Sequence, residues 1–380
     1  MVCEGSLPKS TGGGPRLNLW AVSDELRMRG HEVQVVYLTT EEKVDAPGIY
    51  ALGSRRILVN PMNLLGASPS GVAQVVGAFQ PDVIFGLGSW NIAWASAYDS
   101  RVPRVLMVGD PEHVIHSYRR QYVNREPLAY EEIANYHQLG MQTKAVYLNL
   151  MRDCAAVFCG AGQSVEWFRS QGLNVEYIPM PIVEPAFPGW RRRKEDMPQN
   201  EKPRILMAGH LGGIATLSGL YYLLDEVLPY MPDYTDYDWN ICGGEGLMPS
   251  HAQRFKMHYP EIKFRGYMED IRKEMLQSDI FFCPTSSVVG VRTRIVEAWA
   301  LGSCVVAHAA NGVGQPEVED RTNIVLEETG MGLAEVIRTL AKCPGVRYEM
   351  GHAARQTFED KFRTELSAGR IIDVMEQVVS

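Results

Sequence analysis

Two arginines stand two positions apart in the segment 290–302, which reads Gly-Val-Arg-Thr-Arg-Ile-Val-Glu-Ala-Trp-Ala-Leu-Gly. The spacing of its apolar residues predicts a helix that begins near Arg292. Arg292 and Arg294 would then lie in the first helical turn, where a cation opposes the helix dipole. A bound diphosphate would offset that cost, because guanidinium groups and helix N-termini both bind phosphate oxygens. We therefore predict a phosphate contact for Gly290, Arg292 and Arg294.

A carboxylate follows on the same expected helix. Glu297 comes one turn after Thr293 and Arg294, so its side chain would face the same ligand. A carboxylate in that place suits the hydroxyls of a ribose. The competing interpretation is a surface Arg–Glu pair three residues apart, which contributes only about 0.3 kcal/mol.

Two glycine-rich segments each stand between an expected strand and an expected helix. Glycines there let backbone N–H groups approach a phosphate closely, and the following helix dipole favours an anion. The first segment contains Gly12, Gly13 and Gly14; the second contains Gly212 and Gly213 beside His210, which would donate to a pyrophosphate. The alternative is a simple turn in each case. Neither segment has the GxGxxG spacing of nicotinamide cofactor sites, so no such cofactor is expected.

Asp110 and His113 follow the apolar run Arg104–Val108, which is typical of a buried strand. At the carboxyl end of such a strand, a carboxylate or an imidazole can orient a sugar hydroxyl or move a proton. The two residues are both candidates, and the sequence does not choose between them. The alternative is that Asp110-Pro111 only caps the next helix.

Short apolar runs alternate with helical patterns along the chain, which predicts an α/β protein with parallel sheets. A proline-rich stretch with a basic run interrupts the alternation near its middle. We expect two Rossmann-like, doubly wound domains that face each other across a cleft, where ligands bind at the carboxyl ends of strands. The expected divisions are residues 1–182, a linker 183–203, residues 204–362, and a last helix 363–380.

The bulk composition limits the possible functions. The chain has 380 residues, a net charge of -8 and 46% hydrophobic residues, which argues against a nucleic-acid binder and for a large core. Seven cysteines without a CxxC pair indicate reduced thiols. No apolar stretch approaches the length of a membrane span and no signal peptide is visible, so a cytoplasmic protein is expected.

Across its whole length the chain resembles the retaining GT-B glycosyltransferases of family 4. The resemblance begins with Gly12–Arg29 and the strand entry Gly30-His31-Glu32-Val33. It is strongest over Gly290–Glu319, where Gly-x-Arg-x-Arg-Ile-Val-Glu-Ala and Pro316-Glu317-Val318 look like the donor-site helix and its following loop.

The resemblance implies transfer of a hexose-type sugar from a nucleoside diphosphate to an acceptor hydroxyl, with retention of configuration. The carboxy-terminal domain would hold the donor, and the last helix would cross back to the amino-terminal domain. Tyr267 and Met268 are candidates to border the base, although ordinary loop packing would explain them equally well. The acceptor would be a glycan, a lipid-linked sugar or another hydroxyl compound, and a lipid-linked acceptor would bring the protein to the inner face of the membrane.

Two positions depart from the family pattern. The first of two glutamates eight residues apart is Val289 here, and an expected lysine near 217–219 is Ser218. No cofactor or metal is expected, because Asp236-Tyr237-Asp238 precedes a strand instead of following one. Two alternatives stay open: a catalytically degenerate GT-B subunit that acts as a partner or scaffold, and a nucleotide-sugar epimerase.

Overall fold

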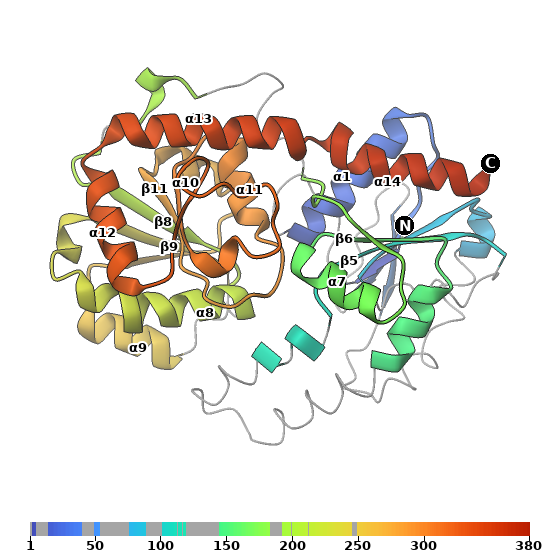
Figure 1. Ribbon diagram of the computed structural model, residues 1–380, viewed down its shortest axis with the longest axis horizontal. Helices are drawn as coiled ribbons and strands as arrows, with labels where there is room; N and C mark the ends of the chain where they lie inside the picture. Colours follow the sequence, from blue (N-terminus) through green and yellow to red (C-terminus); the bar gives the residue numbers. More distant parts are fainter. Residues whose placement is uncertain are drawn as a thin grey trace.

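The computed structural model consists of two α/β domains side by side (Figure 1). It describes residues 2–4, 14–39, 49–53, 76–88, 101–111, 113–115, 117–118, 144–182, 192–198, 200–211, 213–244 and 249–380. Each domain is built on one sheet whose strands are all parallel, with seven strands in the first and six in the second among these residues. The expected fold class is therefore confirmed.

The amino-terminal sheet has the order β3-β2-β1-β4-β5-β6-β7. Its strands are β1 (Val2–Glu4), β2 (Val35–Thr39), β3 (Ile49–Gly53), β4 (Ile84–Leu87), β5 (Arg104–Val108), β6 (Ala156–Cys159) and β7 (Val175–Tyr177). Helix α1 (Gly14–Met28), helix α7 (Gly162–Ser170) and a helical segment at 144–152 pack beside it. Every residue of β5 is buried, as an apolar run in the middle of a parallel sheet should be.

The carboxy-terminal sheet has the order β10-β9-β8-β11-β12-β13. Its strands are β8 (Arg204–Ala208), β9 (Asp238–Cys242), β10 (Lys263–Gly266), β11 (Ile280–Cys283), β12 (Val305–His308) and β13 (Val325–Glu327). Its helices are α8 (Ile214–Tyr222), α9 (Pro249–His258), α10 (Arg272–Gln277), α11 (Thr293–Ala300), α12 (Gly330–Ala341) and α13 (Pro344–Lys361). In both sheets the strand order reverses beside the first strand of the domain, which is where ligands bind in folds of this kind.

The chain passes between the domains at two places that touch each other. Ile178 lies in the core of the amino-terminal domain, and Ile182, four residues on, lies in the core of the other. The second passage runs from α13 into α14 (Thr364–Val379), and the Thr364 hydroxyl donates to the Ile182 carbonyl at 3.2 Å.

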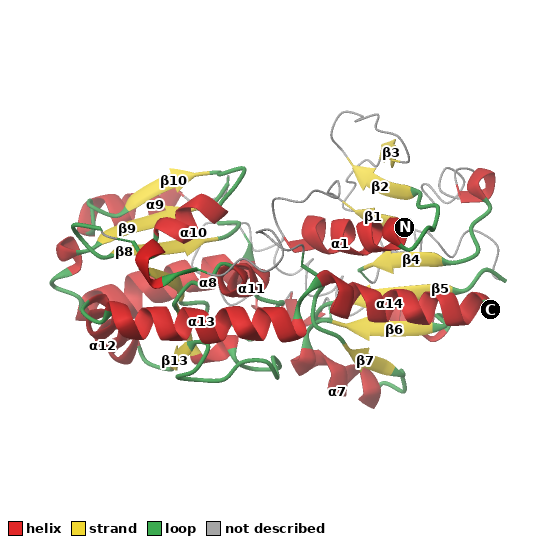
Figure 2. Ribbon diagram, turned by 90° about the horizontal axis from the view of Figure 1, so that it is seen from above, coloured by secondary structure: helices red, strands yellow, loops and turns green. Residues whose placement is uncertain are grey.

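Helix α14 lies against α1 of the amino-terminal domain (Figure 2). Ile371, Ile372 and Met375 are fully or nearly fully buried against Val22 and Leu26. Beside this apolar contact, charged residues of α14 pair with the end of α1: Arg29 with Asp373 at 2.6 Å, and His31 with Glu376 at 2.8 Å. The last helix thus completes a core that the first domain does not fill by itself.

Candidate active site

Arg294 reaches from α11 to the end of β8, across the point where the strand order of the second sheet reverses. Its Nη1 donates to the Ala208 carbonyl and to the Thr216 hydroxyl, both at 2.8 Å. A Cβ atom on Gly209 would lie 2.2 Å from the same Nη1, so a side chain at this position would displace the guanidinium. The group is half-buried, and its Nε and Nη2 have no hydrogen-bond partner among the described residues. Arg294 therefore presents a fixed cation beside the N-terminus of α8.

Arg292 has a different environment, although it is only two residues away. It is 2% exposed, and its guanidinium donates to Asn311 at 2.8 Å and to the carbonyls of Ser287, Val289 and Gly290. The Asn311 amide in turn donates to three carbonyls at the ends of β11 and β12. Arg292 thus holds the loop before α11 in shape, and the predicted phosphate contact of this residue stays a prediction.

Glu297 lies one turn after Arg294 on the same helix, as expected. It is half-buried and forms no hydrogen bond or ion pair with any described residue. Burial raises the pKa of its carboxyl to about 8, against the lowering influence of Arg294 and Arg272. A half-buried carboxyl that has no partner among the described residues, next to a fixed cation, suggests a place for a ligand.

Asp110 joins the two domains. Its side chain is 7% exposed; one carboxylate oxygen accepts from Gln163 at 2.8 Å and from Ser164 at 2.5 Å. The other oxygen accepts from the backbone N–H of Gly290, in the loop that Arg292 shapes. The structure therefore brings Asp110 to the candidate site from the opposite domain.

His113 lies apart from this contact, against the helices of its own domain. Its Nδ1 is 3.2 Å from the Tyr147 hydroxyl, and its ring lies 4.7 Å from the ring of Trp167. Burial lowers the pKa of the imidazole, and the nearby Lys144 lowers it further, so His113 is neutral at pH 7. Of the two candidates that the sequence left open, the geometry favours Asp110.

The domains also meet beyond Asp110. The Tyr177 hydroxyl at the end of β7 donates to both carboxylate oxygens of Glu317, at 2.9 and 3.1 Å. The start of α7 packs directly on the loop after β12: a Cβ atom on Gly162 would lie 2.2 Å from the Gly314 carbonyl oxygen. The first domain therefore contacts both the Gly290 loop and the loop after β12 of the second domain.

The remaining predicted residues fall at the rim of this region or outside the described part. His210 is exposed, and its carbonyl accepts from the N–H of Gly213, which caps α8. Tyr267 is 64% exposed beside Gly244, and Met268 packs on the core of the second domain. Gly14 is the first residue of α1, while Gly12, Gly13 and Gly212 lie outside the described residues.

The two departures from the expected pattern are both buried. Val289 is 2% exposed, and the fully buried Ser218 hydroxyl lies 3.1 Å from that of Ser287. Two residues that the sequence analysis did not single out, Gln163 and Ser164, contact Asp110. Nothing in their spacing indicates this, because the contact depends on how α7 packs beside β5.

The described part of the chain contains no group of three or more His, Cys, Asp or Glu side chains that could hold a metal ion. Asp238 of the Asp-Tyr-Asp sequence pairs with Lys263 at 2.6 Å at the start of β9, and Asp236 lies in the preceding turn. Within the same residues, no helix is both long and apolar enough to cross a membrane.

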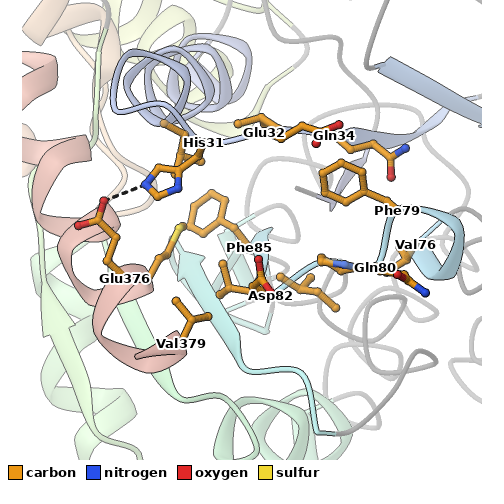
Figure 3. Close-up of a pocket in the computed structure, with 16 residues that line it drawn as sticks. His31, Glu32, Gln34, Val76, Phe79, Gln80, Asp82, Phe85, Glu376 and Val379 are labelled. Atoms are coloured by element: carbon orange, nitrogen blue, oxygen red, sulfur yellow. Dashed lines mark hydrogen bonds and ion pairs between the residues drawn. The ribbon is translucent and has the colours of Figure 1, made fainter.

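A separate hollow opens at the opposite edge of the first sheet, where β2 and β4 begin (Figure 3). The cavity measures about 250 Å³ and lies between the end of α14 and the segment before β4. Phe79 and Phe85 form part of its apolar wall, and the His31–Glu376 pair borders it. It contains none of the predicted site residues, so it is not the candidate active site.

The comparisons with known proteins agree with this arrangement. Residues 202–343 match the family described as glycosyl transferases group 1. The second domain is a glycosyltransferase domain. The match runs from the start of β8 to the end of α12, so this glycosyltransferase domain includes the whole second sheet with Arg294 and Glu297. No curated protein sequence matches the chain.

Solved glycosyltransferases share the fold over both domains. Sucrose-phosphate synthase from Thermosynechococcus elongatus is 13% identical, with a TM-score of 0.71, and the alignment covers 99% of this chain and 98% of that one. HepE from Anabaena with UDP-glucose is 16% identical, with a TM-score of 0.71 and 99% of each chain covered. WaaG, a glycosyltransferase of lipopolysaccharide biosynthesis, is 13% identical, with a TM-score of 0.67 and 98% and 99% covered. The protein therefore has the GT-B fold.

Proposed function

We propose that this glycosyltransferase moves a hexose-type sugar from a nucleoside diphosphate to an acceptor hydroxyl, with retention of the anomeric configuration. The observation that carries the proposal is that Arg294 and Glu297 lie one turn apart on the same face of α11. Arg294 supplies a cation beside two helix N-termini, and two of its nitrogens have no hydrogen-bond partner among the described residues; Glu297 supplies a carboxyl that has no partner among the same residues. A nucleoside diphosphate has the complementary groups, a diphosphate and a ribose, next to each other.

In the reaction, the bond between the sugar C1 and the diphosphate oxygen breaks, and a bond from C1 to the acceptor oxygen forms. The diphosphate leaves with the bonding electron pair, and its departing oxygen receives the proton of the acceptor hydroxyl. Arg294 and the N-termini of α8 and α11 would stabilise the charge that develops on the leaving group. Because Arg294 already supplies a cation there, we propose that the transfer requires neither a metal ion nor another cofactor.

The relatives suggest which substrates to test first. HepE was solved with UDP and with UDP-glucose, so UDP is the first nucleotide to try. WaaG acts in lipopolysaccharide biosynthesis. We propose a glycan or lipid-linked sugar as acceptor; the reaction would then take place in the cytoplasm or at the inner face of the membrane.

The test is a titration with UDP, GDP, ADP, CDP and dTDP, followed by thermal unfolding. A ligand at about 100 times its dissociation constant should stabilise the native protein by about 2.7 kcal/mol. We expect one nucleotide to give this shift, and Arg294→Ala to remove most of it. Arg254→Ala is the matched control, because Arg254 is an exposed arginine of the same domain that pairs with Asp225.

Arg292→Ala is less suitable, since it would leave several loop carbonyls without a donor and disturb the loop itself. If no nucleotide shifts the unfolding of the folded wild-type protein, the proposal fails. The buried Val289, which replaces an expected glutamate, would then favour a degenerate subunit that works with a partner.

A further inference from the structure

The carboxylate of Asp110 is held from behind by the first turn of α7. The Ser164 hydroxyl, 5% exposed, and the Gln163 amide both donate to the same oxygen, at 2.5 and 2.8 Å. Both donors are neutral, so neither of them forms an ion pair with the carboxylate. Two donors on one oxygen also fix the rotation of the side chain, which a single hydrogen bond would not.

The second oxygen of Asp110 points across the domain boundary to the N–H of Gly290. Gly290 has φ +80 and lies three residues before the start of α11, in the loop fixed by Arg292 and Asn311. A carboxylate has about four acceptor positions, and donors from the described residues occupy three of them. Among the described residues no donor occupies the fourth position, which we take to be available beside the candidate donor-binding helix.

We propose that Ser164 and Gln163 are positioning residues for sugar transfer, which hold Asp110 so that its remaining acceptor position receives a hydroxyl of the donor sugar. The inference rests on the proposed function and deepens it. Among the described residues, Arg294 and Glu297 of the second domain are the candidates that hold the nucleotide, and Asp110 contacts neither of them. The sugar subsite, in contrast, is complete only when the first domain brings Asp110 to the Gly290 loop.

This division between domains makes a specific prediction about Ser164→Ala. The affinity for the free nucleoside diphosphate stays within about twofold of wild type, because neither Arg294 nor Glu297 is touched. The additional affinity that the sugar gives to the nucleotide sugar falls, and kcat falls about tenfold, the equivalent of one buried hydrogen bond. Ser164→Thr keeps the hydroxyl and should recover most of the loss.

Ser170→Ala is the matched control on the same helix. Ser170 is exposed and its hydroxyl donates to the Trp167 carbonyl, so its removal should change none of these values. Asp110→Asn should give the same pattern as Ser164→Ala. Because both changes act through one carboxylate, the double variant should lose much less than the product of the two single losses.

The possible outcomes distinguish failure of the proposed function from failure of the positioning role alone. If the wild type binds no nucleotide, the proposed function fails and this inference with it. If the wild type binds a nucleotide but Ser164→Ala weakens the diphosphate and the sugar nucleotide equally, only the positioning role is overturned. Fully multiplicative losses with Asp110→Asn, or a Ser164→Thr variant as impaired as the alanine, would overturn it as well.

Discussion

Arg292 and Arg294 show how two like residues divide two tasks. Arg292 is buried, and its N–H groups donate to loop carbonyls. Arg294 is half-buried, and two of its three nitrogens have no hydrogen-bond partner among the described residues. A guanidinium remains charged even when buried, so Arg292 also adds positive charge beneath the loop. The cost of placing two cations at one helix start is thus met partly by the protein itself and partly, we propose, by the donor.

Glu297 should make both stability and nucleotide binding depend on pH. Its folded pKa of about 8 lies above the ordinary 4.5, so the native state retains a proton that the unfolded chain loses between these values. The free energy of unfolding should therefore fall as the pH rises from 5 to 8, relative to Glu297→Gln. If the ribose binds the ionised carboxylate, affinity should rise over the same range, by at most about tenfold per unit.

Isothermal titration at several pH values measures this dependence, and urea unfolding measures the stability. Glu269→Gln, at an exposed glutamate of the same domain, serves as the control and should keep the wild-type profile. A pH profile that is the same in wild type and Glu297→Gln would show that this carboxyl does not contact the nucleotide.

For single residues, the sequence predicts which side chains follow which strand, but not the contacts that these side chains form. Arg294, Glu297 and Asp110 could be placed because a parallel sheet gathers the carboxyl ends of its strands at one edge. The role of Arg292 could not, since it depends on three carbonyls that converge only in the folded loop. Ser164 likewise contacts Asp110 over a separation of 54 residues.

Helix α14 is an element of the chain's carboxy-terminal end that packs on the amino-terminal domain. It lies in sequence after the second domain but buries its apolar face on α1 of the first. The charged pairs beside that face are largely exposed, so they contribute little in comparison with the apolar contact. The stability of the first domain should therefore depend on residues at the far end of the chain.

Ile372→Ala tests this dependence. Ile372 is fully buried, and its truncation should destabilise the first domain by about 2–5 kcal/mol through lost burial and a residual cavity. Val379→Ala, in the last turn where the side chain is 44% exposed, should cost less than about 0.5 kcal/mol. Hydrogen exchange of β5 and β6 reports on the first domain alone; unchanged protection in Ile372→Ala would contradict the prediction.

Elements were predictable where the apolar pattern alone determines them. Arg104–Val108 has the bounds read from the sequence, because it is a central strand buried throughout. Strand β3 was not predicted, since its Ala51 and Gly53 have low strand propensity. After α8, a π-helical turn at Leu223–Val227 precedes Pro229, which cannot continue an α-helical hydrogen-bond ladder.

In the whole molecule the two domains contact each other. Three contacts join the domains around the candidate donor-binding loops: Asp110 with Gly290, Tyr177 with Glu317, and the start of α7 with Gly314. None of them could be read from the sequence, because each joins residues more than 100 positions apart. Together they form the polar boundary that we expect to close over a bound donor.

Gly314→Ala should loosen this boundary. The residue has φ +72, and an added Cβ would lie 2.1 Å from the Gln163 nitrogen. We expect a larger radius of gyration by small-angle X-ray scattering and a higher KM for the donor, while strain costs about 1–2 kcal/mol. In Gly345→Ala the added Cβ meets nothing within 4 Å, so scattering and KM should remain at wild-type values. An unchanged radius in both variants would argue that the contact yields locally instead.

The bond from Thr364 to the Ile182 carbonyl has a mechanical consequence. Because both passages of the chain meet there, we expect this contact to serve as the hinge between the two domains. Such a joint permits a swing but resists sliding. A swing would part Tyr177 from Glu317 and Asp110 from Gly290 without unpacking either core, and the spent nucleotide could leave through the opening. The residues of the hinge, Thr364 and Ile182, would then differ from those that hold the domains closed, such as Tyr177 and Asp110. Mutation could alter the two sets separately.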